Sequence, residues 1–373
     1  LQNYHMFSDL LWGMLLRLVP LDPWHVYFRI APWFYSCGLS LGTYVIALTW
    51  SGKRPVALLA VALTLFTSNF GYVLPMLLGP ERYFYWDSIF WVQSPALTIF
   101  NPGVSASYAL FLTGGWALVR WLREGRTGTL LLLALMWGVL PGFKVYPAIL
   151  ALAALAAAGI VRLAAARETR LLAALGAVLP VFLAVFLPAN LNAPSLIRWL
   201  PGFNLATMLT APDRMALLPA AELKLLFAQA PVATAVLIGL LIPVFLVGNL
   251  GVRSLGLGLL AKAACRPGRG DPFLLFLAVL GGGALAAPVL FVQRGVQWNT
   301  IQFFYYAVVL AAVPAAAQAW TWLESRRRAG QILGAAALLL LGAPGWVQAF
   351  CVVTWGYTAS RAELDASLWL RRR

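Results

Sequence analysis

The sequence contains very little charge. Asp, Glu, Lys and Arg make up 10% of the 373 residues, whereas 62% are hydrophobic and the mean hydropathy is +0.82. This composition lies far outside that of a soluble domain. Cysteine is also scarce: Cys37, Cys265 and Cys351 fall in or beside different apolar segments, without the spacing of metal ligands. Neither a disulfide framework nor a zinc site is therefore predicted, and we expect free thiols.

Several familiar motifs are missing as well. The sequence has no phosphate-binding P-loop, dinucleotide fingerprint, His-Glu-x-x-His or nucleophile elbow. The net charge of +15 would suggest nucleic acid in a soluble protein, but no basic cluster comes with a folded aqueous surface, so we expect no nucleic-acid partner. The first residues, Leu-Gln-Asn-Tyr-His-Met, have neither a basic region nor an apolar core like those of a signal peptide. The chain looks truncated at its start, and a further C-terminal piece is expected to be absent too.

Long apolar runs dominate what is present. A spanning helix needs about 20 mostly apolar residues, and the sequence offers about ten such runs with short connections. The predicted fold is all-α, a polytopic transmembrane helical bundle that forms a single domain over residues 1–373 of a multi-pass protein in the cytoplasmic (inner) membrane. Residues 5–19 predict a short interfacial helix instead of a span, because they carry charge and are followed by prolines. The predicted spans are 28–50, 55–74, 103–122, 129–142, 145–163, 171–189, 229–250, 272–292, 300–323 and 331–354.

Charge assigns the two sides of this bundle. Ten spans place both ends of the chain on one side, and the turns on the other side carry 15 basic and four acidic residues, a net charge of +11 against +4 for the remainder. The positive-inside rule makes the more basic side cytoplasmic. Two long loops, 75–102 and 190–228, then lie outside, and within the second we expect Trp199 to Phe203 to form a half-buried surface helix.

One stretch organises the candidate site, Gln293 to Tyr306, at the mouth of an apolar span. Its polar side chains would each cost several kcal/mol if they faced lipid, so they are expected to face protein or a wet cavity. A helix that begins near Asn299 would use this residue as its N-cap and place Gln302 and Tyr306 on one face. The alternative is an interfacial aromatic belt, which suits Trp298 and residues 303–306. A belt leaves three polar residues of the stretch unexplained: Arg294, Gln297 and Gln302.

Three carboxylates are candidates for catalysis. Asp87 follows Tyr83-Phe84-Tyr85-Trp86, and flanking aromatics would both bind a sugar face and raise the pKa of a carboxyl by desolvation. Glu81 is the second candidate, although it could pair with the adjacent Arg82. Asp9 with His5 is the third, although interfacial helices carry such residues routinely. For Asp87, a helix N-cap or a salt bridge is as good an explanation as catalysis.

The candidate phosphate ligands are basic residues near the outer loops. Lys144 stands between Pro141 and Pro147, which break the helices around it and leave the ammonium at an outer helix junction beside Tyr146. A snorkelling interfacial lysine is the alternative. Arg294 and Arg214 are similar but less enclosed.

With these features, the chain resembles the GT-C superfamily of integral membrane glycosyltransferases, in particular prokaryotic members. The resemblance rests on Tyr4-His5-Met6, on Phe143-Lys144-Val145-Tyr146, and on the run Gln293-x-Gly-x-x-Trp298-Asn-Thr-Ile-Gln-Phe303. It implies a polyprenyl-phosphate (undecaprenyl- or dolichyl-phosphate) sugar donor and a catalytic Asp or Glu in the first outer loop, sometimes with a divalent metal (Mg²⁺ or Mn²⁺). In that alignment the first loop precedes residue 1, and 75–102 is the second outer loop, where Asp87 or Glu81 would supply a further acid.

The expected function is transfer of a sugar from a polyprenyl phosphate to a glycan, lipid or protein acceptor on the outer face. Asp87 would act as the base or a metal ligand, and Lys144 and Arg294 would hold the phosphate. One alternative is a noncatalytic subunit of a membrane assembly. Another is a transporter or flippase for lipid-linked glycans, which should show paired charges near the bilayer midplane and related half-repeats, and the sequence shows neither.

Overall fold

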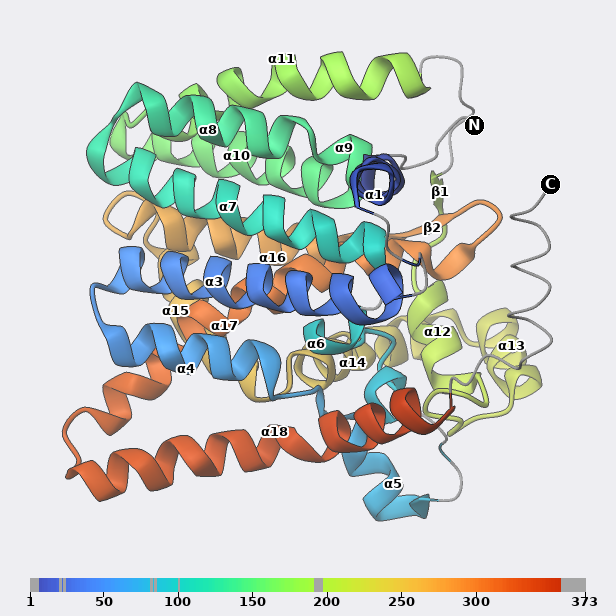
Figure 1. Ribbon diagram of the computed structural model, residues 1–373. Coiled ribbons are helices and arrows are strands. Elements are labelled where there is room, and N and C mark those ends of the chain that lie inside the picture. Colours follow the sequence, from blue (N-terminus) through green and yellow to red (C-terminus); the bar gives the residue numbers. More distant parts are fainter. Residues whose placement is uncertain are drawn as a thin grey trace.

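The computed structural model describes residues 7–19, 22, 25–80, 83, 86–99, 101–190 and 197–356. Within these ranges the chain is almost entirely helical, and its long helices run side by side between two ends (Figure 1). The long helices are α3 (Ala31–Ser51), α4 (Arg54–Leu65), α7 (Pro102–Glu124), α8 (Thr127–Gly138), α10 (Val145–Ala166), α11 (Arg170–Asn190), α14 (Pro231–Leu250), α16 (Pro272–Leu290), α17 (Gln302–Leu323) and α18 (Arg328–Gly356).

The two ends differ in construction. At one end, here called the basic end, short turns join α3 to α4, α7 to α8, α10 to α11 and α17 to α18, and a loop joins α15 (Leu257–Cys265) to α16 (Figure 1). The opposite end, called the outer end after the predicted topology, carries the short elements. These are α1 (Phe7–Leu18), η1 (Val26–Ile30), η2 (Phe70–Tyr72), α5 (Val73–Leu78), η4 (Trp86–Ser88), α6 (Pro95–Thr98), α9 (Leu140–Phe143), β1 (Ile197–Trp199), α12 (Phe203–Thr210), α13 (Ala220–Gln229), β2 (Phe291–Gln293) and η6 (Gln297–Ile301).

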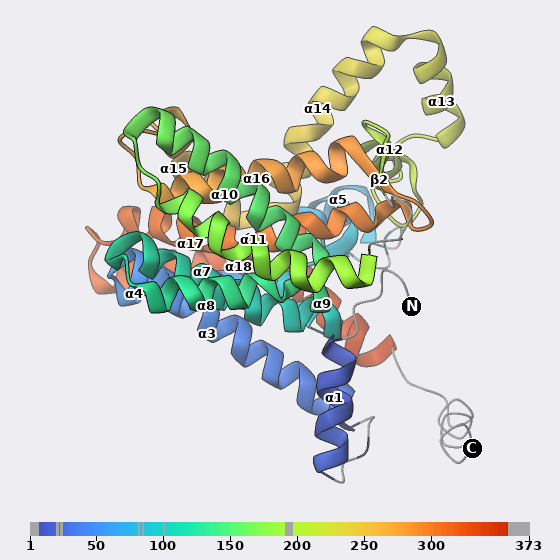
Figure 2. The same ribbon diagram turned by 90° about the horizontal axis from the view of Figure 1, so that it is seen from above.

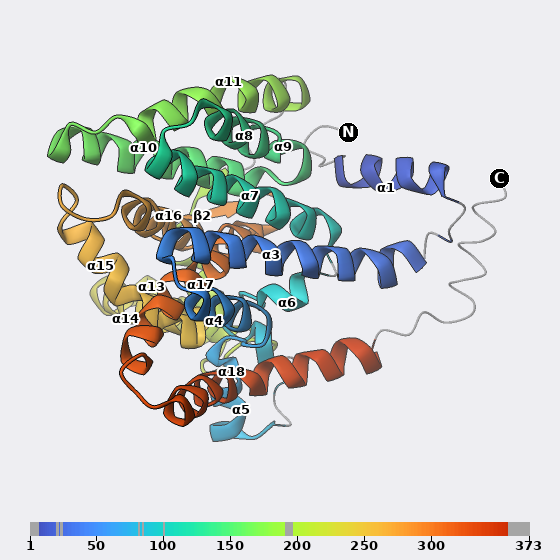
Figure 3. The ribbon, with the colours of Figure 1, turned by 60° about the vertical axis from the view of Figure 1, so that its left-hand side comes forward.

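Helix α17 lies at the centre of the bundle, where it contacts α3, α4, α10 and α16. In the most apolar stretch of α17, 78% of the residues are buried inside the bundle. In the most apolar stretch of α18, only 11% are buried. Helix α18 instead exposes large apolar side chains such as Leu333 and Leu340, both 70% exposed. Such a surface suits lipid, and α18 lies along one edge of the bundle in Figures 1 and 3. In the view from above, α14 and α1 lie on opposite sides of the bundle (Figure 2).

Each of the ten predicted spans coincides with a helix or a bent pair of helices. Six helices in the described part of the chain are long and apolar enough to cross a membrane, and a seventh crossing is formed if the bent pair Arg54–Leu65 and Phe70–Leu78 counts as one. The chain is thus an all-α, multi-pass membrane protein. The full count of about ten spans stays a prediction, because α3 and α7 are not among the six.

The second span differs from its predicted continuous form over 55–74. The chain bends by 51° after α4. Asn69 causes the bend, because its Oδ1 accepts from the backbone N–H of Gly71 at 2.8 Å and caps η2. Its Nδ2 donates to the carbonyl oxygens of Asp87 and Val92, so the same side chain holds the outer loop against the break.

The predicted surface helix over Trp199 to Phe203 is wrong for its first part. Residues Ile197–Trp199 form strand β1, which pairs antiparallel with β2, and Trp199 lies opposite Phe291. A turn at Pro201 and Gly202 follows, where Gly202 adopts a positive φ of 77°, and α12 begins at Phe203. The pairing escaped prediction because each strand is only three residues long and Trp199 pairs with a residue 92 positions later in the sequence.

Arg253 is one of the 15 basic residues that the sequence assigned to the cytoplasmic turns, and its position differs from that prediction. It lies in η5 (Gly251–Gly256), between α14 and α15, and is fully buried. Its guanidinium donates to the carbonyls of Thr67 and Thr64, the free carbonyls at the end of α4. The residues Val232–Cys265 therefore form one long helical segment that contains the buried Arg253, where the sequence had suggested a loop.

Two local predictions are confirmed. Lys144 interrupts the helical hairpin with extended backbone angles (φ −160°, ψ 125°), so that α9 ends before it and α10 begins after it. The short helix near the start of the chain is also present as α1. It is anchored to α3 through Trp12, whose Nε1 donates to the hydroxyl of Tyr35 at 2.6 Å.

Candidate functional site

The segment 291–306 connects the candidate residues of the outer end. It comprises β2, η6 and the first turn of α17. Asn204, fully buried on α12, holds it in place by donating to Pro288 O at 2.7 Å and to Thr300 Oγ1 at 3.2 Å. Thr300 in turn donates to Phe291 O. These buried bonds satisfy an irregular backbone that could not face lipid.

The predicted N-cap at Asn299 is wrong, because this residue lies inside η6 and α17 begins three residues later. The side chains of Asn299 and Gln302 instead meet each other, with Gln302 Nε2 donating to Asn299 Oδ1 at 3.1 Å. Tyr306 is fully buried, as expected for the inward face, and shares a 2.7 Å hydrogen bond with Ser107.

Asp87 is fully buried in η4. Its Oδ2 accepts from the backbone N–H of Ser94 at 2.6 Å, which closes the loop between the two residues. Its Oδ1 is also buried and has no hydrogen-bond partner in the described part of the chain. One carboxyl oxygen thus serves the local fold, and the other remains without a donor.

The electrostatic surroundings of Asp87 set its protonation. Burial raises the pKa of Asp87 to about 7, and this effect outweighs the opposing effects of the hydrogen bonds from Ser94 and of the positive charge of Arg253. Tyr305 lies within electrostatic range of both Asp87 and Arg214. A carboxyl with a pKa near neutrality is suited to exchange protons at physiological pH.

Arg214 lies over the ring of Trp91, with the guanidinium carbon 4.1 Å from the ring centroid. It donates to Ser88 Oγ at 3.0 Å and pairs with the exposed Asp213 at 3.1 Å. Trp91 stacks against Trp298 at a centroid distance of 6.3 Å and donates from its indole N–H to Asn204 O. Burial lowers the pKa of Arg214, whose side chain is 15% exposed. We call Asp87, Ser88, Trp91, Arg214, Trp298 and Tyr305 the Asp87–Arg214 cluster.

Trp91 adopts a backbone conformation that is rare for a bulky residue, with φ at +81°. Such conformations persist only where the surroundings enforce them. Here the loop is held by Asn69, by Asn249 Oδ1, which accepts from Val92 N at 2.9 Å, and by the indole bond of Trp91. The indole is therefore placed by the backbone, between a guanidinium and a second indole.

Lys144 forms a second group with Tyr146, Gln293 and Phe303, called the Lys144 group. The ammonium lies 5.5 Å from the centre of the Tyr146 ring, and Tyr146 donates to Gln293 Oε1 at 2.6 Å. Tyr146 also packs edge-on against Phe303 at 4.9 Å. Lys144 is half-buried, and burial lowers the pKa of its amine. Among the described residues it has no carboxylate partner within ion-pair distance.

The structure thus sorts the predicted residues into two groups that share the segment 291–306. Arg294 and Gln297 are exposed and belong to neither, whereas Trp298 is 54% exposed within the Asp87–Arg214 cluster. Asp9 is exposed on the first turn of α1. His5 and Glu81 lie outside the described residues.

The divalent metal that the resemblance implies at Asp87 stays a prediction. Within the described ranges no three His, Cys, Asp or Glu side chains come together as a metal would require, and Glu81 lies outside these ranges. The positive charge of Arg253 acts on the carboxyl of Asp87, and Tyr305 lies within electrostatic range of both Asp87 and Arg214. The chemistry proposed below is written for the side chains of this chain.

Sequence reasoning missed several residues that build this site. Tyr305 stands in an aromatic run that also suited an interfacial belt, and Trp91 stands in the long loop 75–102. Asn69, Asn204 and Asn249 gave no pattern at all. Their signal is the amide itself: a buried Asn in an apolar chain must bond to backbone groups somewhere. Where those groups lie cannot be read from neighbouring residues.

Comparison with known proteins identifies solved structures with a similar fold. No protein-family model matches the chain, and no curated protein sequence matches it. Among solved structures it is similar to the archaeal oligosaccharyltransferase AglB from Archaeoglobus fulgidus in complex with an inhibitory peptide and a dolichol-phosphate. The TM-score is 0.53 at 14% identity, over 100% of this chain and 50% of that chain. The oligosaccharyltransferase of the same organism tethered to an acceptor peptide gives 0.52 at 15% identity, over 99% and 49%.

At these identities the likeness shows the fold alone. The chain spans about half the length of both oligosaccharyltransferases, and the shared part extends over essentially all of its own residues. The architecture that the GT-C resemblance implied, a bundle of membrane helices, is supported at this level.

Proposed function

We propose that the chain carries the membrane part of a glycosyltransferase that takes a sugar from a polyprenyl-phosphate donor and transfers it to an acceptor at the outer end. The observation that carries the proposal is the Asp87–Arg214 cluster. It combines a carboxyl whose pKa lies near 7, a mostly buried guanidinium and two stacked indoles, one of them 54% exposed. The solved structures with this fold are oligosaccharyltransferases, and one of them holds a dolichol-phosphate.

The two cations provide the phosphate contacts. Lys144 and Arg214 are enclosed enough to interact strongly with an anion. Lys144 is linked to the segment 291–306 through Tyr146, and Arg214 through Trp91. Lys144 has no acidic partner among the described residues, so a phosphate would satisfy it without displacing anything. The exposed Arg294 would meet the phosphate as it enters, and Tyr146 would fix the position of the Lys144 stem.

The polar and aromatic residues of η6 serve the sugar. The exposed face of Trp298 offers an apolar platform of the kind that sugar rings stack upon, and Gln297, Asn299 and Gln302 offer amide groups beside it. Gln302 Oε1 is buried without a partner in the described part of the chain, and a sugar hydroxyl could donate to it.

Asp87 would accept the proton of the acceptor. In the transfer, the bond from the anomeric carbon to the phosphate oxygen breaks, and a bond to the acceptor heteroatom forms. The acceptor proton passes to the carboxylate, and the polyprenyl phosphate leaves as an anion. Because Asp87 is fully covered, this role requires the loop 86–94 to open and expose Oδ1.

The same burial supports the second candidate function, a noncatalytic membrane subunit. In that case Asp87 would only close the loop through Ser94, and the cations would hold a lipid without reaction. Substitution of Asp87 distinguishes the two, because an amide keeps the bond to Ser94 but cannot accept a proton.

The test is turnover with a panel of undecaprenyl-phosphate sugars, using the purified protein in lipid nanodiscs. Asp87→Asn should lower transfer by at least about a hundredfold, with a melting temperature no lower than that of the wild type and unchanged binding of undecaprenyl phosphate. Glu222→Gln is the matched control, because this exposed carboxylate on α13 belongs to neither group, and it should transfer at the wild-type rate.

Unchanged turnover in Asp87→Asn would remove the catalytic role of Asp87. Wild-type protein that binds undecaprenyl phosphate but transfers from no donor would favour the noncatalytic subunit. Absence of binding as well would reject the proposed use of both cations.

A further inference from the structure

A cavity lies at the basic end, at the opposite end of the bundle from the segment 291–306. It has a volume of about 1020 Å³ and is bordered by α15, by the loop 266–271 and by the ends of α10 and α16. Its rim carries three exposed cations, Lys262, Arg266 and Arg269. Its wall is apolar and is formed by Ala165, Leu259, Ala263 and Leu274.

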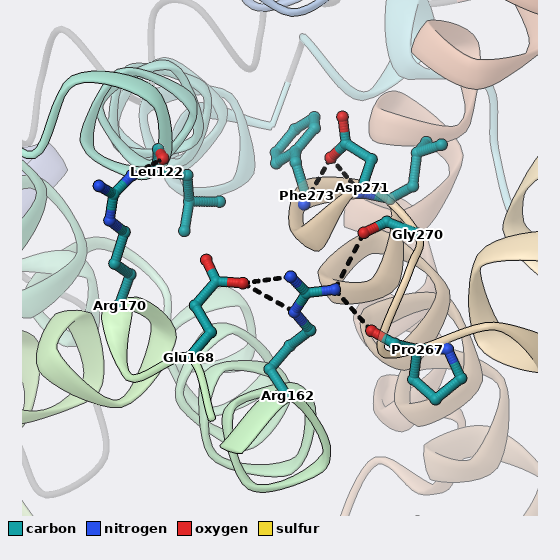
Figure 4. Close-up of polar contacts among 9 residues, drawn as sticks. Leu122, Arg162, Glu168, Arg170, Pro267, Gly270, Asp271 and Phe273 are labelled. Carbon is teal, nitrogen blue, oxygen red and sulfur yellow. Dashed lines mark hydrogen bonds and ion pairs between the residues drawn. The ribbon is translucent and has the colours of Figure 1, made fainter. Parts of the chain in front are cut away.

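The loop that forms the rim is held from below by Arg162, at the last turns of α10 (Figure 4). The guanidinium, 10% exposed, donates to the carbonyls of Pro267 at 2.6 Å and Gly270 at 2.9 Å, and also binds Glu168. Figure 4 shows the three partners converging on this one side chain. A loop tied in this way keeps its shape before a ligand arrives, which lowers the entropic cost of binding.

The other end of the loop is fixed by Asp271. Its Oδ1 accepts from the backbone N–H groups of Phe273 and Leu274 and caps α16, and its Oδ2 accepts from Trp50 Nε1 at 3.0 Å. The carboxylate is therefore engaged through both oxygens. Its negative charge offsets one of the three positive charges of the rim, but among the described residues it forms no ion pair with a rim cation.

The remaining acids of the basic end are engaged elsewhere. Glu124 pairs with Arg120 and Arg126, Glu168 with Arg162, and Glu324 with Lys53. Within the part of the chain that the structure describes, the three rim cations accordingly have no ion-pair partner. The cavity keeps an uncompensated positive charge above an apolar wall.

We propose that this cavity binds the phosphate headgroup of an anionic phospholipid from the leaflet at the basic end. The cations match the phosphate, and the apolar wall matches the first carbons of the acyl chains, which a free phosphate would not need. The position fits as well, because α15 belongs to the apolar segment Val232–Cys265 and ends at the rim. Basic pockets between helices at the cytoplasmic surface are known as sites for anionic lipid headgroups.

This site is independent of the proposed sugar transfer, and its test needs no turnover. The purified protein, in zwitterionic micelles that contain phosphatidylcholine, is titrated with phosphatidylglycerol, and bound lipid is counted by native mass spectrometry. Each basic residue near an anionic headgroup contributes roughly fivefold in affinity. The triple variant Lys262→Gln, Arg266→Gln, Arg269→Gln should therefore bind phosphatidylglycerol at least about tenfold more weakly.

The matched control removes the same charge from another turn of the same end. The triple variant Arg326→Gln, Arg327→Gln, Arg328→Gln alters three exposed arginines at the start of α18 and in the turn before it, and should bind phosphatidylglycerol within about twofold of wild type. A third variant, Arg162→Lys, keeps all rim cations but cannot hold both carbonyls at once. It should weaken binding if the shape of the loop matters.

Three results would overturn the proposal. Equal losses in both triple variants would show a general attraction to the basic end. Displacement of the lipid by millimolar inorganic phosphate would show a site for the free anion. Equal binding of phosphatidylcholine and phosphatidylglycerol would show that charge plays no part.

Discussion

The two ends of the bundle terminate their helices by different means. At the basic end, residues in the left-handed conformation close the helices locally, as Gly52 does for α3, Gly125 for α7 and Arg167 for α10. At the outer end, termination depends on buried amides such as Asn69 and Asn204, which bond to the backbone of distant elements. The first device is local in the sequence, and the second is not. Only the second leaves polar groups enclosed among aromatic rings, which a reactive site needs.

The largest expected effect concerns Arg253, which satisfies the end of α4 from across the bundle. Arg253→Met should cost about 3 kcal/mol, because it leaves the carbonyls of Thr64 and Thr67 without a donor and the buried Asp87 without a nearby cation. The melting temperature in detergent measures it, with the exposed Arg326→Met as control. An unchanged melting temperature would show that the break in α4 needs no distant support.

The second prediction concerns the pH dependence of the outer end. Because burial raises the pKa of Asp87 to about 7, the folded protein holds a proton that the unfolded chain releases near pH 4. Stability should therefore fall as pH rises from about 4 to 7 and level off above pH 7. In Asp87→Asn this contribution should vanish, which thermal melts between pH 5 and 8 can test. Identical pH profiles for the two proteins would contradict a raised pKa at Asp87.

A smaller effect is expected at Lys144. Lys144→Gln should weaken binding of undecaprenyl phosphate about tenfold, since it removes one charged contact to the phosphate. Stability should change little, because the ammonium has no ion-pair partner among the described residues. Lys144→Arg, which keeps the charge, should recover most of the affinity. Equal affinities in wild type and Lys144→Gln would leave the Lys144 group without a role in binding.

The smallest effect is expected at the basic end. Lys53 and Glu324 form an ion pair at 2.6 Å, but their side chains are 50% and 42% exposed. Exposed pairs of this kind contribute at most about 1 kcal/mol. Glu324→Gln should therefore leave the melting temperature almost unchanged at 0.15 M salt. A large drop would show that the ion pair between Lys53 and Glu324 is essential to the packing of these two turns.

Sequence reasoning served the basic end better than the outer end. Apolar runs located the helices, and the prolines around Lys144 located the break between α9 and α10. The bend after α4, the strand pair and the burial of Arg253 were missed, because each depends on groups that are far apart in the chain. Arg253 looked like one more basic turn residue, since nothing beside it in the sequence reveals the carbonyls of Thr64 and Thr67.

The same limit applied to the site. Asp87 and Lys144 were expected in one pocket, and the structure instead assigns them to separate groups joined by the segment 291–306. Arg214 had been ranked below Lys144, yet it is Arg214 that bonds to Ser88, the neighbour of Asp87 in the chain. Its partner ring, Trp91, was taken for part of an aromatic loop without a particular role.

The pairing of β1 with β2 also indicates how deep this end of the bundle lies in the bilayer. Open strand edges carry unsatisfied amides that hydrocarbon cannot hydrate, so Ile197–Trp199 and Phe291–Gln293 must sit at or beyond the headgroups. Helix α16 descends directly from β2, and its 19 residues rise about 28 Å, close to the thickness of the hydrocarbon layer. Tyr146 bonds to Gln293 of β2, so the neighbouring Lys144 lies at the same depth as the strand pair. This depth is the headgroup region, where a lipid carries its phosphate.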